Sequence, residues 1–577
     1  ANLTLWLPVL PSMLYLSDIA EFEQYRFVDS WREDAPGRDW ELHAMVGLYD
    51  DPVNQAQMPV EVNFATNGHV AVCGMVVSGK STFLQTLLYS LVNRYAPNCV
   101  NFYILDYSSR MLGCFKALKH CGGIAFEDQA ERTGKLLSMM SRELERRKKL
   151  FGGGNYGQYV RIHGPCEPAL LLVIDGFANF KEKTDNRYED ILIELSREGT
   201  NYGLFLVIAA GGFGVAEIQN RIGENIKTVF SLQMGDRLKY GDTLRTRVEV
   251  IPEPDIAGRG LAMIQGTALE FQTALSLPAD DDYQRAEKMS VIFEKMNAAF
   301  NGKPARPIPE IPAKPTWALL RENEDYMALL KTTDRLPLGY VAEDADICSI
   351  DLRHCFTYLV AGQARTGKSN ALRCLMQAAY DRKGRIAVID SSRSGLAAMA
   401  EEVGAQYVGT EEDLSGFARG LFQEMIERNG LKRALRGQGI PDDEMFEKML
   451  QYPEYYLFID DFIELTTNLY NNSKDMQNIV GFMENFFDKG ALHNMYVFAG
   501  VPLAEYNIAL GYRVFRLAVE QKNGLLLGGD SVRQQLFDFS GLPYSEQSRK
   551  YRPGIALLPA DHERERPEKI VLPMAKG

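Results

Sequence analysis

The chain has 577 residues, of which 46% are hydrophobic and 24% are charged, and its formal net charge is −13. This size allows two large α/β domains, or three to four smaller ones, each with a full core. The sequence has no run of about 18 uncharged apolar residues that could span a bilayer. The negative charge argues against a general nucleic-acid binder, unless a local basic groove offsets it.

The cysteines and histidines give no sign of a metal or redox site. The eight cysteines form no C-x-x-C pair, and the seven histidines never pair at ligand spacing. Because the cysteines lie mainly in apolar segments, we expect buried free thiols in a reducing compartment. The cysteines are Cys73, Cys99, Cys114, Cys121, Cys166, Cys348, Cys355 and Cys374.

The first forty residues stand outside the repeated pattern described below. The chain begins at Ala1 with no charged-then-apolar leader, which favours a fragment of a longer protein. We expect residues 1–40 to be an inter-domain connector, or an adaptor that packs on the domain that follows.

A phosphate-binding loop follows the apolar run 70–73 and precedes a helical pattern. In the motif G-x-x-x-x-G-K-[ST], backbone N–H groups surround a phosphate, the lysine reaches the β- and γ-phosphates, and the hydroxyl ligates Mg²⁺. We therefore expect ATP to bind at this loop, with Mg²⁺ on Ser81. The expected ligands are Gly74, Met75, Val76, Val77, Ser78, Gly79, Lys80, Ser81 and Thr82.

A second copy of the motif begins 288 residues later, after the apolar run 356–361. Two matches in the same strand–loop–helix context favour true nucleotide sites over ordinary glycine-rich turns. We expect a second ATP here, with Mg²⁺ on Ser369. The expected ligands are Gly362, Gln363, Ala364, Arg365, Thr366, Gly367, Lys368, Ser369 and Asn370.

Each loop is followed at a similar distance by an apolar strand that ends in aspartate. Asp175 lies 95 residues after Lys80, and Asp460 lies 92 residues after Lys368. This arrangement is typical of a Walker B strand, whose carboxylate holds the Mg²⁺ shell. We expect Asp175 and Asp460 to contact the metal through water.

Further similarities indicate that the chain duplicates one large unit. Short similar segments recur in the same order at offsets near 290 residues, which a duplication explains. Short apolar runs alternate with amphipathic helical stretches in each unit, as in a mostly parallel sheet covered by helices on both faces. The P-loop then falls at the carboxyl end of a strand, where such sheets bind ligands. The matching segments are 47–49 with 338–340, 104–110 with 388–393, and 260–264 with 554–558.

A proline-rich segment separates the units. Residues 304–315 contain five prolines, which fit neither a sheet nor a helix interior, so we expect an extended, semi-rigid linker. The predicted divisions are 1–40, 41–303, 304–315 and 316–577.

The groups that would activate water differ from those of an efficient ATPase. Many P-loop motors place a glutamate directly after the Walker B aspartate, but here the positions hold Gly176 and Asp461. Glu182 is a weak substitute for the first. Asp461 is the candidate catalytic carboxylate of the second, with a helix N-cap or a second metal ligand as alternatives. The strands 204–210 and 495–499 run into Gly211 and Gly500 without a polar sensor for the γ-phosphate.

Three groups of basic residues are candidate arginine fingers. Residues 142–149 mix arginine and lysine with glutamate at helical spacing, which favours a solvated helix face over contact with a neighbour's nucleotide. Arg110 and Arg393 occupy matching places after a predicted strand and are further candidates.

Taken together, these motifs resemble the FtsK/SpoIIIE ATPases, with two tandem RecA-like P-loop NTPase domains. Three segments are similar to the membrane-anchored ATPase of type VII secretion, EssC or EccC: residues 46–55, 257–260 and 524–529. The resemblance runs from about Leu42 to the C-terminus. It implies that the chain is the second and third of three ATPase domains.

The resemblance also implies partners and a place in the cell. It implies ATP and Mg²⁺ as cofactors, export of WXG100-type proteins that dock through a C-terminal signal, and contact with other type VII secretion membrane components. It further implies a homo-hexamer of the full protein at the cytoplasmic face of the membrane.

Two other functions stay open. The family's namesakes translocate double-stranded DNA, but they carry a winged helix after the motor, and the charge of −13 opposes phosphate binding. The other is a nucleotide-gated scaffold without hydrolysis. We expect no nucleic-acid partner.

Overall fold

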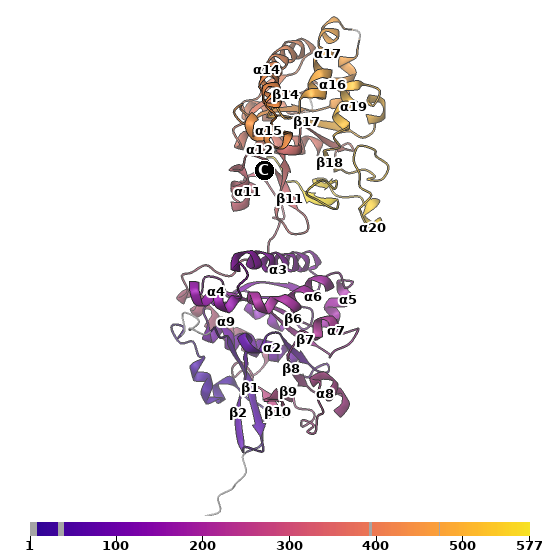
Figure 1. Cartoon of the computed structure of the whole chain (residues 1–577). Helices are drawn as coiled ribbons and strands as arrows, with labels where there is room; N and C mark the ends of the chain where they lie inside the picture. Colours follow the sequence, from indigo (N-terminus) through magenta and orange to yellow (C-terminus); the bar gives the residue numbers. More distant parts are fainter. Residues whose placement is uncertain (1–7, 33–39, 392–394, 472, 577) are drawn as a thin grey trace, which may run out of the picture. The chain divides into compact units, whose positions relative to one another are not determined.

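The computed structural model describes residues 8–32, 40–391, 395–471 and 473–576. The chain divides into two compact units, Ala1–Pro309 and Glu310–Gly577 (Figure 1). The division falls inside the proline-rich segment, whose two ends attach to different units. The Ala305 N–H donates to the Lys119 carbonyl at 2.8 Å, and the Met574 N–H donates to the Pro315 carbonyl at 2.8 Å.

Unit 1 is built on one ten-stranded sheet with the order β2-β1-β10-β9-β8-β3-β7-β6-β4-β5. The six strands from β8 to β5 are parallel, and the other four extend the sheet antiparallel. The strands are β1 (His43–Asp51), β2 (Ala56–Asn63), β3 (Val70–Cys73), β4 (Val100–Asp106), β5 (Cys121–Phe126), β6 (Ala169–Asp175), β7 (Leu204–Ala210), β8 (Thr228–Leu232), β9 (Arg259–Ile264) and β10 (Thr267–Thr273).

Helices cover both faces of this sheet, because the central strands are apolar on both sides. Along β3, Val70 and Val72 pack into one core with α2 and α9, whereas Ala71 and Cys73 pack into the other with α3 and α6. The helices are α1 (Phe64–Asn67), α2 (Lys80–Arg94), α3 (Ala130–Phe151), α4 (Tyr156–His163), α5 (Phe177–Lys183), α6 (Glu189–Glu198), α7 (Asn220–Gly223), α8 (Arg237–Leu244) and α9 (Asp282–Ala299), with 3₁₀ turns η1 (Leu16–Asp18), η2 (Ala20–Gln24), η3 (Met111–Phe115) and η4 (Gly199–Tyr202).

The described part of the N-terminal segment packs on unit 1. The Leu16 N–H donates to the Leu275 carbonyl at 3.0 Å. The Trp31 indole N–H donates to the Val92 carbonyl near the end of α2 at 2.8 Å. Both Leu16 and Trp31 are buried, so the segment contributes to the core beside the P-loop helix.

Unit 2 repeats this sheet with the order β12-β11-β20-β19-β18-β13-β17-β16-β14-β15. Again six strands, from β18 to β15, are parallel and four are antiparallel. The strands are β11 (Arg335–Val341), β12 (Ile347–Asp351), β13 (Thr357–Gly362), β14 (Arg385–Ile389), β15 (Gln406–Val408), β16 (Tyr455–Ile459), β17 (Met495–Pro502), β18 (Gly524–Leu527), β19 (Ile555–Leu558) and β20 (Glu568–Val571).

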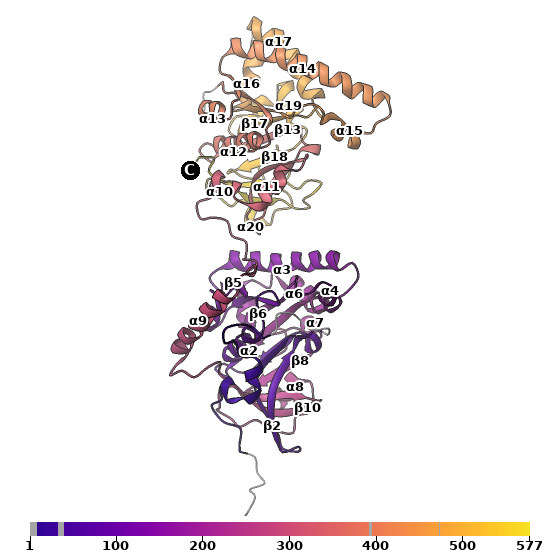
Figure 2. The ribbon, with the colours of Figure 1, turned by 90° about the vertical axis from the view of Figure 1, so that its left-hand side faces the viewer.

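The helices of unit 2 also form two layers, with α12 in one core and α14, α16, α17 and α19 in the other (Figure 2). They are α10 (Trp317–Arg321), α11 (Glu324–Leu330), α12 (Lys368–Asp381), α13 (Ala397–Glu402), α14 (Glu411–Gly437), α15 (Asp442–Met449), α16 (Phe462–Leu469), α17 (Lys474–Lys489), α18 (Tyr506–Ala509), α19 (Arg513–Val519) and α20 (Tyr544–Gln547), with the 3₁₀ turn η5 (Leu352–His354).

The two sheets confirm the predicted fold, and their register corrects one detail of the predicted repeat. Ser231 pairs with Leu261, and Leu526 pairs with Leu557. The structural counterpart of Gly554 is therefore Gly258, two residues before the Gly260 that the sequence similarity had selected. Glycine at both positions adopts positive φ, 78° and 88°, at a turn that packs behind the P-loop.

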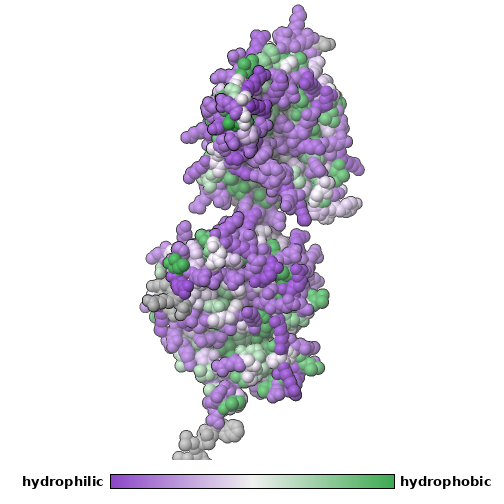
Figure 3. Space-filling model, in the orientation of Figure 1, coloured by the Kyte–Doolittle hydropathy of each residue, from purple (hydrophilic) through white to green (hydrophobic). Residues whose placement is uncertain are grey.

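Hydrophilic side chains dominate the visible face of each unit (Figure 3). Every helix among the described residues is too short or too polar to span a bilayer. All eight cysteines are free thiols, and six of them are buried, but Cys166 is exposed.

Candidate nucleotide-binding sites

The first P-loop joins β3 to α2 and has the backbone that a phosphate cradle needs. Gly79 has φ 102°, and Val77 has φ 64°. A β-branched residue in this left-handed region is an outlier that costs about 1–3 kcal/mol, and such strain is concentrated at functional sites. The Lys80 ammonium donates to the carbonyls of Gly74 and Met75, both at 2.7 Å, which holds it across the loop.

The second P-loop, between β13 and α12, repeats this geometry. Gly367 has φ 110°, and Arg365, at the place of Val77, has φ 62°. The Lys368 ammonium donates to the Gln363 carbonyl at 2.8 Å. Burial lowers the pKa of both lysines. The two predicted loops therefore have positive φ at the same two positions, although four of their eight residues differ.

In unit 1 the predicted Mg²⁺ ligands lie together. The Ser81 hydroxyl, at the start of α2, donates to the Asp175 carboxylate, at the end of β6, at 2.6 Å. Asp175 is 1% exposed. Burial raises its pKa to about 6, against the opposing hydrogen bond from Ser81. A hydroxyl and a carboxylate in contact are the oxygen donors that Mg²⁺ prefers, so these residues fit the ion.

A second buried carboxylate, which sequence reasoning left out of the site, stands beside Asp175. Asp106 ends β4 and is in register with Asp175 on the neighbouring strand. Its Oδ1 accepts the N–H groups of Ser108 and Arg110, and its Oδ2 has no hydrogen-bond partner among the described residues. Burial raises the pKa of Asp106. The repeated segment 104–110 was the signal that could have revealed it.

Unit 2 has the same pair of acidic residues. Asp460 follows β16, and Asp390 follows the adjacent β14. Both are buried, and the Tyr407 hydroxyl donates to Asp390 at 3.0 Å. Each unit therefore carries two carboxylates at the carboxyl ends of neighbouring strands, beside its P-loop.

The position after Asp175 cannot hold a catalytic glutamate without a backbone shift. Gly176 has φ 78° and caps α5. A Cβ at this position would lie 2.7 Å from the Tyr107 carbonyl oxygen. The backbone after β4 therefore approaches so closely that glycine is the residue that fits here without a shift.

Another carboxylate approaches the first loop from the segment after β7. The Gly211 N–H donates to Glu217 at 3.0 Å. Burial lowers the pKa of Lys80, and the charge of Asp175, with a smaller contribution from Glu217, opposes this effect. Glu182, the substitute considered from the sequence, is exposed on α5. Glu217 lies six residues after Gly211 at the end of β7, so a search for polar residues directly after the strand does not find it.

Asp461 caps the helix that follows the second Walker B strand. Its Oδ1 accepts the Glu464 N–H at 3.0 Å at the start of α16. Burial lowers the pKa of Lys368, and the charge of Asp461 opposes this effect. The predicted ligand Asn370 is used elsewhere: its amide donates to the Pro573 carbonyl and accepts the Ala575 N–H.

The basic stretch 142–149 on α3 is tied down locally. Arg147 is 1% exposed and donates to the carbonyls of Tyr202 and Pro168, so the expected solvated face is wrong for this residue. Arg146 pairs with Glu143 and Glu167. Arg110 pairs with Asp128 at 2.8 Å. Arg393 lies outside the described residues.

Residues 32–157 match the FtsK/SpoIIIE family, and they include the first P-loop. This segment of unit 1 is similar to the domains of that family. This family is one of P-loop ATPases, which agrees with the cradle and the Walker B strand described above.

The relatives are type VII secretion proteins. EssC of Staphylococcus aureus is 24% identical over 459 residues, covering 76% of this chain and 30% of the relative. EccC of Thermomonospora curvata is 28% identical over 414 residues, covering 68% and 30%. YukB of Bacillus subtilis is 24% identical over 545 residues, covering 93% and 34%. The chain thus spans about a third of the length of these relatives.

Solved structures agree on the fold. ATPases 2 and 3 of Geobacillus thermodenitrificans EssC match with a TM-score of 0.71 at 22% identity, covering 99% of this chain and all of that one. ATPases 2 and 3 of Thermomonospora curvata EccC, in complex with a signal sequence peptide, match with a TM-score of 0.64 at 22% identity, covering 99% and 100%. This chain and the two solved structures therefore share the fold of two successive units.

Proposed function

We propose that the chain is the part of a type VII secretion ATPase that holds two nucleotides and receives the export substrate. The observation that carries this proposal is the duplicated P-loop and Walker B geometry, found in a chain aligned over its length with ATPases 2 and 3 of EssC. The parent protein would be anchored in the membrane, with these units on its cytoplasmic side.

Each unit would bind one ATP with Mg²⁺. The backbone N–H groups of residues 74–79 and 362–367 would surround the phosphates. Lys80 and Lys368, now bonded to loop carbonyls, would turn to the β- and γ-phosphates. The metal would compensate the negative charge of the phosphates. It would be held by Ser81 with Asp175 in unit 1 and by Ser369 with Asp460 in unit 2.

Both units would hydrolyse ATP slowly. Gly176 supplies no base, and the backbone around it leaves no space for one. In unit 2, one oxygen of Asp461 is engaged by the helix it caps. Efficient hydrolysis requires a group that orients the attacking water, so we assign these sites a regulatory role and place the main hydrolytic domain elsewhere in the parent protein.

The substrate would be a WXG100-type protein that docks through its C-terminal signal. The precedent is the EccC structure solved in complex with a signal sequence peptide. Titration of such a peptide into the full chain, followed by fluorescence anisotropy, tests this assignment. Saturable binding that a scrambled peptide does not reproduce supports it; equal binding of both peptides contradicts it.

A further inference from the structure

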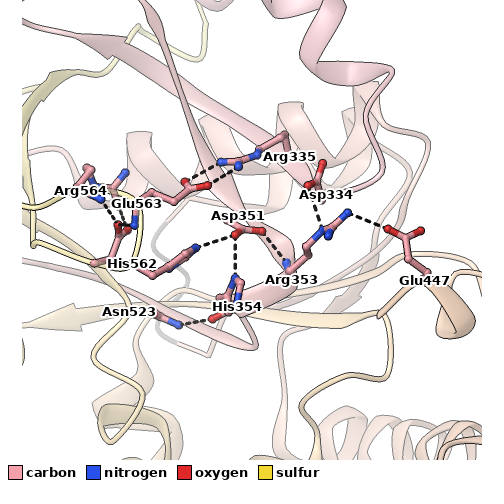
Figure 4. Close-up of polar contacts among 11 residues, drawn as sticks. Asp334, Arg335, Asp351, Arg353, His354, Glu447, Asn523, His562, Glu563 and Arg564 are labelled. Atoms are coloured by element: carbon pink, nitrogen blue, oxygen red, sulfur yellow. Dashed lines mark hydrogen bonds and ion pairs between the residues drawn. The ribbon is translucent and has the colours of Figure 1, made fainter. Parts of the chain in front are cut away.

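A cluster of two histidines and one aspartate lies in unit 2, outside the nucleotide site. The Nδ1 of His354 and the Nε2 of His562 both face the same oxygen of Asp351, each at 2.9 Å (Figure 4). Their three ligand atoms lie within 4.8 Å of one another. The histidines are 208 residues apart in sequence, which is why spacing rules could not pair them.

We infer that Asp351, His354 and His562 form a binding site for a divalent transition-metal ion of the Zn²⁺ class. Two imidazole nitrogens and one carboxylate oxygen are a ligand set that Zn²⁺ accepts, with water as the fourth ligand. Imidazole favours Zn²⁺ over Mg²⁺, which selects oxygen ligands.

The geometry needs only small side-chain movements. Tetrahedral bonds of about 2.0 Å place ligand atoms about 3.3 Å apart. The two nitrogen–oxygen distances are 2.9 Å, and the two imidazole nitrogens lie within 4.8 Å of each other. The side chains of His354 and His562 are 61% and 43% exposed, so their rings have room to adjust. The cluster lines a cavity of about 280 Å³, which has space for the fourth ligand.

The carboxylate is held in place through its other oxygen. The Asp351 side chain is 8% exposed, and its Oδ1 accepts the Arg353 N–H at 2.9 Å. The histidines face Oδ2, so the metal would bind that oxygen without disturbing the contact from Arg353.

The surrounding charge favours a cation. Three arginines lie near the cluster, and each pairs with at least one carboxylate: Arg335 with Glu563, Arg353 with Asp334 and Glu447, and Arg564 with Asp561. Asp351 adds one more acid, and Lys522 also lines the cavity. Five carboxylates therefore face four cationic side chains, which leaves one excess negative charge for a cation to offset.

Two nearby thiols lie outside the group of ligand atoms. Cys348 and Cys355 also line the cavity, but among the described residues the donor atoms within 4.8 Å of one another belong to Asp351, His354 and His562. The site would therefore use nitrogen and oxygen donors.

The position in the fold indicates a structural cross-link. His354 ends η5, between β12 and β13, and His562 lies in the connection from β19 to β20. The Asn523 amide donates to the His354 carbonyl at 3.0 Å, just before β18. The cluster thus lies at the amino ends of β13 and β18, whereas the P-loop leaves the carboxyl end of β13. The ion would fasten the antiparallel strands to the nucleotide-binding part of the sheet.

The test is titration of Zn²⁺ into the full chain by calorimetry, with excess Mg²⁺ present to occupy oxygen-only sites. All variants would carry Cys166→Ser, because Cys166 is the exposed thiol among the described cysteines. His354→Ala and His562→Ala remove ligands, and His163→Ala removes an exposed histidine from unit 1 as the matched control. Circular dichroism without metal confirms that each variant is folded.

We expect one strong Zn²⁺ site per chain, a rise in the melting temperature on binding, and a tetrahedral visible spectrum with Co²⁺. His354→Ala and His562→Ala should each weaken binding by at least the roughly 10- to 100-fold that loss of a supporting contact costs. His163→Ala should bind as the parent does. Failure of the parent to bind Zn²⁺, or equal affinity in the His354→Ala/His562→Ala double variant, would overturn the assignment.

Discussion

Ser81 and Asp175 are joined by a 2.6 Å hydrogen bond that connects the first turn of α2 to the end of β6. This contact links the two halves of a nucleotide site that are 94 residues apart. Asp106, in register with Asp175, adds a second buried acid and raises the pKa of its neighbour. The first site should therefore depend on pH in a range where an ordinary aspartate is already fully ionised.

Mg²⁺-dependent ATP binding to unit 1 should weaken as the pH falls below about 6, the pKa of Asp175. Protonation removes the charge that Mg²⁺ needs, so the affinity should fall by up to about tenfold per pH unit. Calorimetry on the Lys368→Ala chain isolates this site. The same raised pKa means that the free energy of unfolding decreases as the pH rises from the ordinary aspartate value to about 6, since the folded state binds the proton more tightly.

The control for this dependence is Asp175→Asn, an uncharged side chain of the same shape. It should bind ATP weakly at every pH, with the dependence removed. If the chain that retains Asp175 bound ATP with constant affinity from about pH 7.5 to about pH 5, this carboxylate would not be a ligand of the metal shell.

Lys80→Ala and Lys368→Ala should each remove one nucleotide site and leave the other intact. Hydrogen bonds to charged groups contribute about 1.5–3 kcal/mol, so the affinity of the altered site should fall by roughly 10- to 100-fold. Calorimetry with a slowly hydrolysed ATP analogue measures both sites in one titration. Loss of both sites in either single variant would contradict two independent cradles.

Gly176→Glu should not create a catalytic base. The added Cβ meets the Tyr107 carbonyl at 2.7 Å, and the φ of 78° is strained for any other residue. We expect the free energy of unfolding of unit 1 to fall by about 1–3 kcal/mol, and phosphate release to stay at the background rate. Urea unfolding and a coupled phosphate assay provide the two measurements.

Gly164 is the matched control for this strain. It has φ 74°, and an added Cβ would meet nothing within 4 Å. Gly164→Ala should therefore show the cost of the positive φ alone, and Gly176→Ala should cost more. Equal destabilisation by the two alanines would rule out the close approach to Tyr107 as the reason for the glycine.

Any residual hydrolysis in unit 1 should depend on Glu217. This carboxylate accepts the Gly211 N–H and interacts electrostatically with Lys80. Gly176 has no side chain that could orient or deprotonate the attacking water. Glu217→Gln should abolish the slow phosphate release of the Lys368→Ala chain while ATP binding persists. Exposed Glu182 gives the control, because Glu182→Gln should leave the rate unchanged; the opposite pattern would return the role to Glu182.

The fold followed from the sequence because its signals are local. The P-loops, the apolar runs that end in Asp175 and Asp460, and their similar spacing specify a strand–loop–helix unit and its duplication. The sequence comparison matched Gly554 to Gly260, two residues away from its structural counterpart Gly258, because short apolar segments align almost equally well at several offsets. Only the strand pairing of β8 with β9 and of β18 with β19 fixes that register.

The site was predicted in part. The phosphate-binding residues follow from a contiguous motif, whereas Asp106 and Glu217 enter through the sheet order and a returning loop. Asn370 belongs to the same contiguous stretch, yet its side chain bonds the C-terminal segment about 200 residues away. Such long-range contacts depend on tertiary packing, which one sequence does not encode in any fixed spacing.

The central claim is that both units hold nucleotide but turn it over poorly. The most direct measurement counts nucleotides bound per chain and follows phosphate release from the same sample. We predict two ATP molecules per chain and release close to the background rate. Rapid release that Lys80→Ala or Lys368→Ala abolishes would contradict this account, because it would show that at least one of the two sites is an active ATPase.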